Sequence, residues 1–226
     1  MEIKTGFVLG AGIMGSGIAP LMAQKGVQAI LADVDDAILK RSIGNIENLL
    51  NKRVAKGKMT EGDVKELLGR IKTTTDMKEA ANADFIIEAV IEDVKLKQKV
   101  FAQLEEVAKP EAILATNTTA CSISEIASAM KDPSRLTGMH FFNPAVVMRL
   151  VEIMPGLATR PEVVKTTKEF AEFLGKEPVI TDKESIAGVA SRVLAGLLNE
   201  AVWVLDEGIS RSEERRVGKE CRSRWS

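Results

Sequence analysis

Short apolar runs alternate along this chain with longer stretches in which apolar residues recur every three or four positions. Residues 3–9 form the first apolar run and residues 27–32 the second. A glycine-rich turn at residues 10–15 and a helical stretch ending near residue 25 lie between them. Short apolar runs are typical of buried strands, whereas a 3.6-residue period indicates an amphipathic helix. The pattern therefore predicts a strand, a helix and a second strand, joined as a right-handed βαβ unit.

The rest of the chain continues this alternation with one interruption. Residues 36–70 are expected to form two amphipathic helices, the second capped by Thr60. A helical period returns at about residues 186–208 and begins a new unit. Further strands are predicted at residues 71–74, 85–89, 113–116, 136–140, 150–154 and 178–181, and helices at residues 95–108 and 161–174. The predicted fold class is α/β, a Rossmann-like, mostly parallel sheet with helices on both faces and an inserted helical pair.

The last sixteen residues, RSEERRVGKECRSRWS, differ in composition from the rest of the chain. They hold six of the 31 basic and three of the 32 acidic side chains, and almost nothing apolar. One interpretation is a basic, disordered tail. Another comes from back-translation, because a suitable choice of codons gives DNA that looks like a widely used short-read sequencing adapter. We interpret residues 211–226 as a fusion artefact, and predict a first domain at residues 1–184 and a truncated second one at residues 185–210.

Charge and composition narrow the classes of function. Without residues 211–226 the chain carries a net charge of −4, which gives no electrostatic reason to expect a nucleic-acid partner. No apolar run approaches the roughly 20 residues of a membrane helix, and no secretory signal is visible. Two distant cysteines fit a reducing cytoplasm, and a single histidine leads us to expect no metal site. The chain has no tyrosine, which excludes the tyrosine acid of short-chain dehydrogenases.

A dinucleotide site is predicted where the first strand meets the first helix. In the turn GAGIMG, Gly10 permits tight folding, Gly12 lets the backbone approach a pyrophosphate, and Gly15 lets helix and strand pack closely. An acidic residue ends the second strand, where it can bond the ribose hydroxyls and repel a 2′-phosphate, so NAD is favoured over NADP. A glycine turn without a ligand is the alternative. The residues expected to hold NAD at this turn are Gly10, Gly12, Ile13, Met14, Gly15 and Asp33.

Two polar segments follow the strands predicted at residues 113–116 and 136–140. Both come at the carboxyl ends of parallel strands, where open α/β sheets bind their ligands. The second segment begins at His140, whose neutral imidazole is a suitable base for a hydroxyl proton. Glu152, on the next strand, is a candidate to orient the ring. Taken alone, these residues leave a purely structural role for the histidine open.

Five segments, GAGIMG, EAVIEDVKLKQKVF, ATNTT, HFFNP and LVEIM, resemble in their order and spacing the L-3-hydroxyacyl-CoA dehydrogenase family, including its 3-hydroxybutyryl-CoA members. The resemblance covers residues 3–209. It implies NAD-dependent oxidation of (S)-3-hydroxyacyl-CoA to 3-oxoacyl-CoA, and the reverse reaction. His140 would be the general base and Glu152 would stabilise its imidazolium. Thr119 would bond the substrate oxygen, and Asn143 would lie near the nicotinamide.

The same resemblance implies further contacts with cofactor and substrate. Ser191 stands where relatives carry a substrate-contacting asparagine, and it keeps a hydroxyl but loses the amide. Residues expected to line the cofactor are Ala89, Glu92, Lys97, Asn117, Thr119 and Asn143. Basic residues expected to hold the nucleotide end of CoA, on the helical pair, are Lys52, Arg53, Lys56 and Lys58. A charge run of this kind is equally typical of solvated surface.

The resemblance also implies an acyl-CoA partner and a homodimer formed through an all-α C-terminal domain. Residues 185–210 would supply only the first helix of that domain. Two alternatives stay open: a dehydrogenase of the 3-hydroxyisobutyrate or 6-phosphogluconate type, and a non-catalytic, crystallin-like NAD-binding relative. The first class uses a lysine acid on a later helix, whereas in this chain HFFNP followed by Glu152 supplies a histidine base. Retention of both members of this pair argues against the second alternative.

Overall fold

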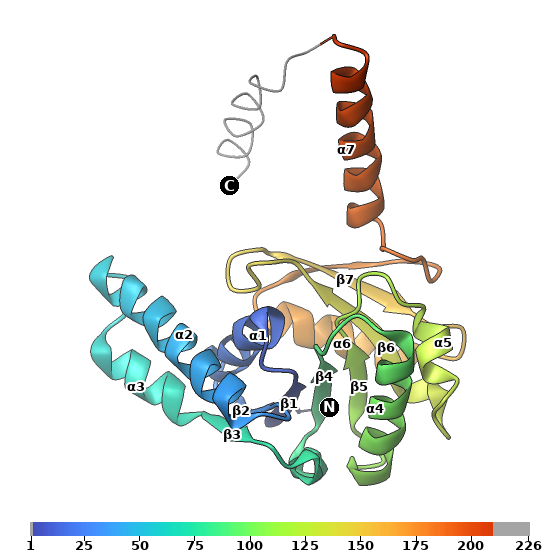
Figure 1. The fold of residues 1–226 in the computed structure, drawn as a ribbon. Coiled ribbons are helices and arrows are strands. Elements are labelled where there is room, and N and C mark those ends of the chain that lie inside the picture. Colours follow the sequence, from blue (N-terminus) through green and yellow to red (C-terminus); the bar gives the residue numbers. More distant parts are fainter. Residues whose placement is uncertain (1, 210–226) are drawn as a thin grey trace. The chain divides into compact units, whose positions relative to one another are not determined.

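The computed structural model describes residues 2–209, so the interpretation of residues 211–226 as an artefact lies outside the described residues. The chain divides into two compact units, one of residues 1–188 and one that begins at residue 189. An eight-stranded sheet with helices on both faces forms the first unit (Figure 1). The predicted α/β class is thereby confirmed.

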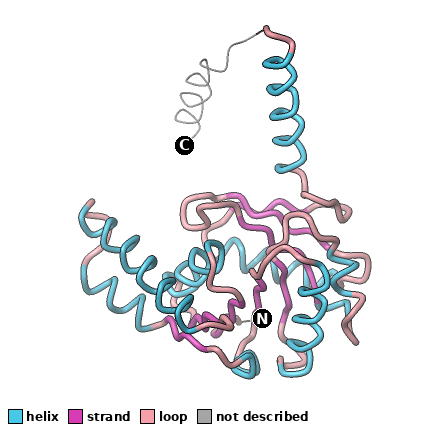
Figure 2. Tube along the Cα trace, viewed as in Figure 1, coloured by secondary structure: helices cyan, strands magenta, loops and turns pink. Residues whose placement is uncertain are grey.

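The elements of the first unit follow one another in the alternating order that the sequence predicts (Figure 2). In chain order they are β1 (Thr5–Leu9), α1 (Ile13–Gln24), β2 (Gln28–Ala32), α2 (Asp36–Ala55), α3 (Glu61–Gly69), β3 (Ile71–Thr74), η1 (Met77–Asn82), β4 (Phe85–Glu88), α4 (Val94–Val107), β5 (Ile113–Thr116), α5 (Ile123–Ala127), η2 (Pro133–Arg135), β6 (Leu136–Phe141), β7 (Leu150–Pro155), α6 (Pro161–Phe173) and β8 (Glu177–Ile180). The short helices η1, α5 and η2 were not predicted, because a helix of one or two turns shows no clear period.

The sheet has the strand order β3-β2-β1-β4-β5-β6-β7-β8. All neighbouring strands are parallel except β6 and β7, which run antiparallel. The chain leaves β1 toward β3 on one side and returns to β4 on the other. The strand order thus reverses between β1 and β4, which is where doubly wound sheets bind their ligands.

Two apolar layers pack on the two faces of the sheet. Alternate residues of one strand point to opposite layers, since successive side chains alternate across a strand. On β4, Phe85 and Ile87 belong to the layer beneath α1, α2 and α6, whereas Ile86 belongs to the layer beneath α4 and α5. The ring of Phe85 lies 4.6 Å from that of Phe170 on α6. These buried layers hold the strand ends that carry the polar residues.

The inserted helical pair, α2 and α3, is anchored by one apolar stripe and one cap. On α2 the buried positions recur at helical spacing and include Leu39, Ile46 and Leu50. Thr60 and Asp63 form a capping box at the start of α3, in which the Asp63 N–H donates to Thr60 Oγ1 at 3.1 Å and the Thr60 N–H donates to Asp63 Oδ2 at 2.8 Å. The predicted cap is therefore confirmed, and such caps stabilise a helix by about 1 kcal/mol.

In the second unit the structure describes one helix, α7 (Ala190–Asp206). It begins four residues later than the sequence period suggested. The reason lies at the end of the first unit, where Ala187 and Gly188 have φ values of 66° and 56°. Left-handed backbone of this kind cannot continue a right-handed helix. None of the residues of α7 is buried. No helix among the described residues is long and apolar enough to span a membrane.

Candidate active site

The glycine turn after β1 is held by contacts that leave no room for a side chain at Gly10 or Gly15. The Gly10 N–H donates to the Ala32 carbonyl at 2.8 Å and so ties the end of β1 to the end of β2. Gly10 has φ 102°, and a β-carbon there would lie 2.5 Å from the carbonyl oxygen of Ala89. A β-carbon at Gly15 would clash with the Gly10 carbonyl. The structure thus places Ala89, predicted to line the cofactor, directly against this turn.

The start of α1 has the features of a phosphate-binding helix terminus. Gly12 is its N-cap, makes no side-chain cap bond, and has no atom within 4 Å of the position that a β-carbon would take. Gly12 and Ile13 line a cavity of about 340 Å³. Ser42 lines the same cavity, and its buried hydroxyl has no hydrogen-bond partner among the described residues. Free helix-terminal amides beside an unpaired hydroxyl fit the pyrophosphate of a dinucleotide.

Asp33 closes this cradle at the end of β2. Its Oδ2 accepts the Ala11 N–H at 2.7 Å, and its Oδ1 accepts the Val34 N–H at 2.8 Å. Each carboxylate oxygen keeps a further lone pair for a ribose hydroxyl. The acidic residue that the sequence placed at the strand end therefore bonds the glycine turn itself. This geometry fits NAD, which has a free 2′-hydroxyl there.

His140 and Glu152 are direct partners across the antiparallel pair β6 and β7. The connection between the two strands is short, so twelve residues of sequence bring the two side chains together. His140 Nδ1 lies 3.0 Å from Glu152 Oε2, and both residues are almost completely buried. A carboxylate only accepts hydrogen bonds, so Nδ1 carries the proton and Nε2 of the neutral ring keeps its lone pair.

Thr119 faces the second nitrogen of this ring. Its Oγ1 lies 2.9 Å from His140 Nε2. The hydroxyl comes from the turn after β5, and β5 and β6 are neighbours in the sheet. A substrate hydroxyl bound at this point can reach both the ring nitrogen and the Thr119 hydroxyl. The sequence prediction grouped these residues, and the structure places them side by side.

The segment that follows β8 lies against Glu152. A β-carbon at Gly188 would clash with the Glu152 carboxylate. Gly188 also has a positive φ, so glycine is favoured there on two grounds. The backbone at Gly188 is therefore packed directly against the Glu152 carboxylate.

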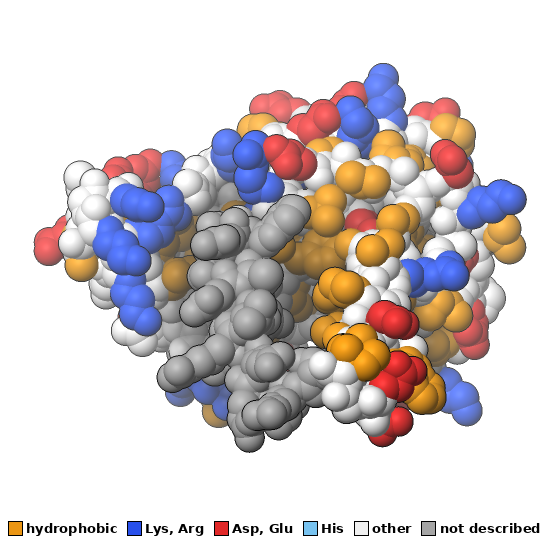
Figure 3. Space-filling view, turned by 90° about the horizontal axis from the view of Figure 1, so that it is seen from above, with side chains coloured by type: hydrophobic (Ala, Val, Ile, Leu, Met, Phe, Trp, Pro, Cys, Tyr) orange, Lys and Arg blue, Asp and Glu red, His pale blue; other side chains and the backbone are white. Residues whose placement is uncertain are grey.

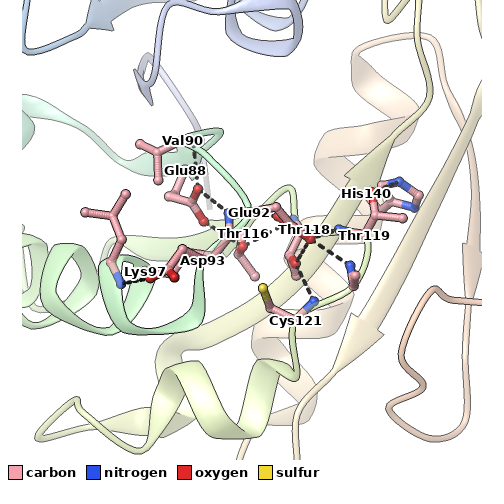
Figure 4. Close-up of polar contacts among 12 residues, drawn as sticks. Glu88, Val90, Glu92, Asp93, Lys97, Thr116, Thr118, Thr119, Cys121 and His140 are labelled. Carbon is pink, nitrogen blue, oxygen red and sulfur yellow. Dashed lines mark hydrogen bonds and ion pairs between the residues drawn. The ribbon is translucent and has the colours of Figure 1, made fainter.

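The loop after β4 and the first turn of α4 form a second polar network beside the turn that carries Thr119 (Figure 4). Glu92 Oε1 accepts the N–H groups of Thr119 and Ala120, each at 2.7 Å. It also accepts the Thr118 hydroxyl. Lys97 Nζ lies 2.6 Å from Glu88 Oε1 and 3.2 Å from Glu92 Oε2. Lys97 was predicted to line the cofactor, yet its side chain is only 1% exposed and its ammonium faces these two carboxylates.

Glu92 stays ionised in this network. Burial raises the pKa of its carboxyl. The Ala120 N–H, the Thr118 hydroxyl, the charge of Lys97 and the Thr119 N–H outweigh burial and lower the pKa to about 2. Several donors aimed at a charged carboxylate favour its ionised form.

The two asparagines predicted near the nicotinamide have different surroundings. Asn117 Oδ1 accepts the Phe141 N–H at 2.8 Å, which ties the end of β5 to β6 beside His140. Asn143 follows β6, precedes a cis proline bond, and lines a cavity of about 440 Å³. Ile13 and Lys52 line the same cavity, which therefore joins the glycine turn to the basic helical pair.

The structure does not bring all the predicted substrate residues together. Lys and Arg side chains gather over the helical pair, on the left of Figure 3. Of these, Lys52 shares the cavity with Asn143, whereas Arg53 and Lys58 line a different cavity. Lys56 is exposed and lines neither of these cavities. Ser191 belongs to the second unit, so its predicted substrate contact stays a prediction.

Sequence reasoning missed two polar residues of this region. Glu88 ends β4 and is completely buried, and Ser42 is a buried hydroxyl on α2. An acidic residue at the end of the apolar run FIIE was the available signal for the first. Nothing in the local pattern marks the second. Among the described residues, no group of three or more His, Cys, Asp or Glu side chains could hold a metal ion.

A sheet with a glycine turn suited to a dinucleotide after β1, and with a carboxylate-oriented imidazole three strands along the sheet on β6, is the framework of an NAD-dependent dehydrogenase. Residues 6–185 match the family described as 3-hydroxyacyl-CoA dehydrogenase, NAD binding domain. The chain belongs to the 3-hydroxyacyl-CoA dehydrogenase family. Its cofactor is NAD, as the sequence predicted, and the relatives described next are named as dehydrogenases of 3-hydroxyacyl-CoA compounds.

Named relatives share most of this chain but extend beyond it. The 3-hydroxyadipyl-CoA dehydrogenase of Escherichia coli is 41% identical over 94% of the chain, which spans 45% of that protein. The 3-hydroxybutyryl-CoA dehydrogenase of Clostridioides difficile is 38% identical over 92% of the chain, which spans 73% of that protein. The crystal structure of (S)-3-hydroxybutyryl-CoA dehydrogenase from Ralstonia eutropha superposes with a TM-score of 0.91 at 34% identity, and covers 97% of this chain and 78% of its own.

Proposed function

We propose that this chain oxidises (S)-3-hydroxyacyl-CoA to 3-oxoacyl-CoA, with His140 as the general base and Glu152 as its orienting carboxylate. The observation that carries the proposal is the continuous contact from Thr119 Oγ1 through both ring nitrogens of His140 to Glu152 Oε2. A ring held at both nitrogens presents its basic nitrogen in one direction.

In the forward direction the 3-hydroxyl takes the place of the Thr119 hydroxyl at His140 Nε2 and stays within hydrogen-bond reach of Thr119 Oγ1. The oxygen–hydrogen bond breaks and its proton passes to Nε2, while the carbon–oxygen double bond forms. NAD, held by the glycine turn and Asp33, would supply the acceptor for the hydride that leaves the same carbon. The imidazolium then carries a positive charge next to Glu152, whose buried carboxylate stabilises it. In the reverse direction the same nitrogen returns the proton to the 3-oxo oxygen.

Residues at the carboxyl ends of β1 and β2 would hold the cofactor. The free amides at the start of α1 would hold the pyrophosphate, and Asp33 would accept the hydroxyls of the adenosine ribose. Exposed apolar side chains flank this position, since Val34 follows β2 and Ile91 follows β4. A flat adenine ring would cover such side chains.

CoA is proposed to lie in the cavity between α1, α2 and the loop after β6. Lys52 and Asn143 both line it, so an acyl chain directed toward His140 and a phosphate near Lys52 can belong to one ligand. Arg53 and Lys58, which line another cavity, are expected to contribute less.

Replacement of the base tests the proposal directly. His140→Gln should lower the turnover of acetoacetyl-CoA with NADH by about two to four orders of magnitude, the usual effect of a positioned acid or base. NADH affinity, measured by fluorescence titration, should hardly change, because the glycine turn does not contact the imidazole. A loss of NADH affinity that equals the loss of turnover would show a structural histidine instead.

A further inference from the structure

A fully buried ion pair lies behind the turn that carries Thr119. Lys97 Nζ and Glu88 Oε1 are 2.6 Å apart, and the two side chains are 1% and 0% exposed. Removing two charges from water costs several kcal/mol per ion, and apolar residues of similar volume are often as stable. Stability alone therefore does not account for this pair.

Glu88 is held by three elements. Its Oε1 accepts the Val90 N–H at 2.7 Å in the loop after β4. Its Oε2 accepts the Thr116 hydroxyl at 2.7 Å at the end of β5. Lys97 reaches it from the first turns of α4. The carboxylate is thus a fixed point between two neighbouring strands and a helix.

Lys97 connects Glu88 to Glu92, which contacts the turn that carries Thr119. Its ammonium also lies 3.2 Å from Glu92 Oε2. The other oxygen of Glu92 accepts the N–H groups of Thr119 and Ala120. The side chain of Glu92 is 38% exposed, so little besides the ammonium and this turn restrains it.

We propose that Lys97 is a positioning residue, which holds Glu92 beneath the 118–120 turn and so fixes the Thr119 hydroxyl against His140. The proposal rests on the proposed function. One ammonium between two carboxylates leaves a net charge of −1. Without the ammonium, Glu92 Oε2 loses its ionic partner and this partly exposed carboxylate turns toward solvent, whether or not Glu88 keeps its charge. The turn then loses the acceptor of two of its N–H groups, and the hydroxyl loses its fixed place.

The test removes the ion pair as a unit. Lys97→Met alone would leave Glu88 buried and unpaired, which can prevent folding. The double variant Glu88→Gln/Lys97→Met removes both charges and keeps the volume. Lys99→Met, on the exposed face of the same helix, is the matched control. Because His140 is the only histidine, ¹⁵N-histidine labelling gives a single pair of ring signals that reports the Thr119 contact without turnover.

A double-mutant cycle with Thr119→Ala separates positioning from general support. The double variant should lower kcat for acetoacetyl-CoA about tenfold and shift the Nε2 signal, with KM for NADH nearly unchanged. In the Thr119→Ala background the same pair of substitutions should lower kcat less than about twofold and leave that signal in place.

Equal losses of kcat in the unsubstituted and the Thr119→Ala backgrounds would overturn the proposal. They would show that the Glu88–Lys97 pair supports the fold independently of Thr119. A loss of NADH affinity equal to the loss of kcat would overturn it too, in favour of a cofactor contact by Lys97. Absence of turnover in the unsubstituted chain would instead count against the proposed function. The ring signals would still decide the positioning role.

Discussion

At the scale of single residues, the chemistry of this domain depends on side chains whose partners are unambiguous. Asp33 is bonded by the N–H groups of Ala11 and Val34 and stands beside the predicted ribose site. His140 has a carboxylate on one nitrogen and a hydroxyl on the other. Each of these contacts predicts how a substitution changes binding or rate.

Asp33 is expected to set the preference for NADH over NADPH. A carboxylate near a 2′-phosphate is repelled by about 1–4 kcal/mol at 4 Å, depending on the effective dielectric constant. Asp33→Ser should therefore lower the ratio of the NADPH dissociation constant to the NADH dissociation constant at least about fivefold. Asp36→Ser, an exposed aspartate in the first turn of α2, should leave the ratio unchanged. Fluorescence titration measures both constants, and an unchanged ratio in Asp33→Ser would contradict the assignment.

Glu92 is expected to make the free energy of unfolding depend on pH in the acidic range. Its pKa falls from 4.5 to about 2 in the folded protein. A carboxyl group whose pKa is lower in the folded protein stabilises the fold at pH values above its pKa in the unfolded chain. This stabilisation is lost as the pH falls from 4.5 toward 2. The free energy of unfolding, measured in urea, should therefore differ most between Glu92→Gln and the unsubstituted chain near pH 6, and much less near pH 3. The exposed Glu47→Gln is the control. If the difference does not narrow in acid, the ionised Glu92 carboxylate is not the source of the stability.

At the scale of elements, one lysine joins the residue just before β8 to the loop between β6 and β7. Lys176 is buried and donates to the carbonyls of Ala145 and Met148. Burial lowers the pKa of its ammonium. This loop carries Asn143 and lines the proposed CoA cavity. The start of β8 therefore shapes a wall of the substrate site.

Lys176→Met should lower the free energy of unfolding by about 1–3 kcal/mol, because two buried carbonyls lose a charged donor. It should also raise KM for acetoacetyl-CoA more than KM for NADH, since the loop lines the CoA cavity. Lys165→Met, exposed on α6, is the control. Urea unfolding and initial rates measure the two effects. Unchanged stability together with unchanged KM values would show that the loop holds its shape without this lysine.

At the scale of the whole molecule, the cofactor site belongs to one unit. The glycine turn, Asp33, Glu92 and His140 all lie within residues 1–188, which have their own buried layers. Domains with their own core can fold alone. Ser191 and the exposed apolar side chains of α7 belong to the other unit.

A chain of residues 1–188 is therefore expected to fold cooperatively and to bind NADH with an affinity within about threefold of the 226-residue chain. Turnover of acetoacetyl-CoA should be lower, because the segment that carries Ser191 is gone. Thermal unfolding and fluorescence titration check the first two statements. Failure of the shorter chain to bind NADH would show that the cradle needs residues beyond 188.

The sequence by itself determined the features that depend on near neighbours along the chain. The period of apolar residues predicted β1, α1 and β2, because side-chain burial repeats every two residues in a strand and every 3.6 in a helix. The capping pair at Thr60 needs only four consecutive residues. The pairing of His140 with Glu152 was also accessible, because twelve residues suffice for two antiparallel strands and a short connection.

Only the tertiary structure decided the features that depend on contacts between distant segments. The ion pair of Glu88 and Lys97 joins a strand end to a helix, and the apolar run that ends at Glu88 does not show that Lys97 is its partner. Lys52 and Lys58 lie in one basic run, yet they line different cavities because Lys52 lies on α2, whereas Lys58 lies in the turn between α2 and α3. The late start of α7 follows from left-handed backbone at Gly188, where a glycine packs against Glu152, 36 positions earlier in the chain.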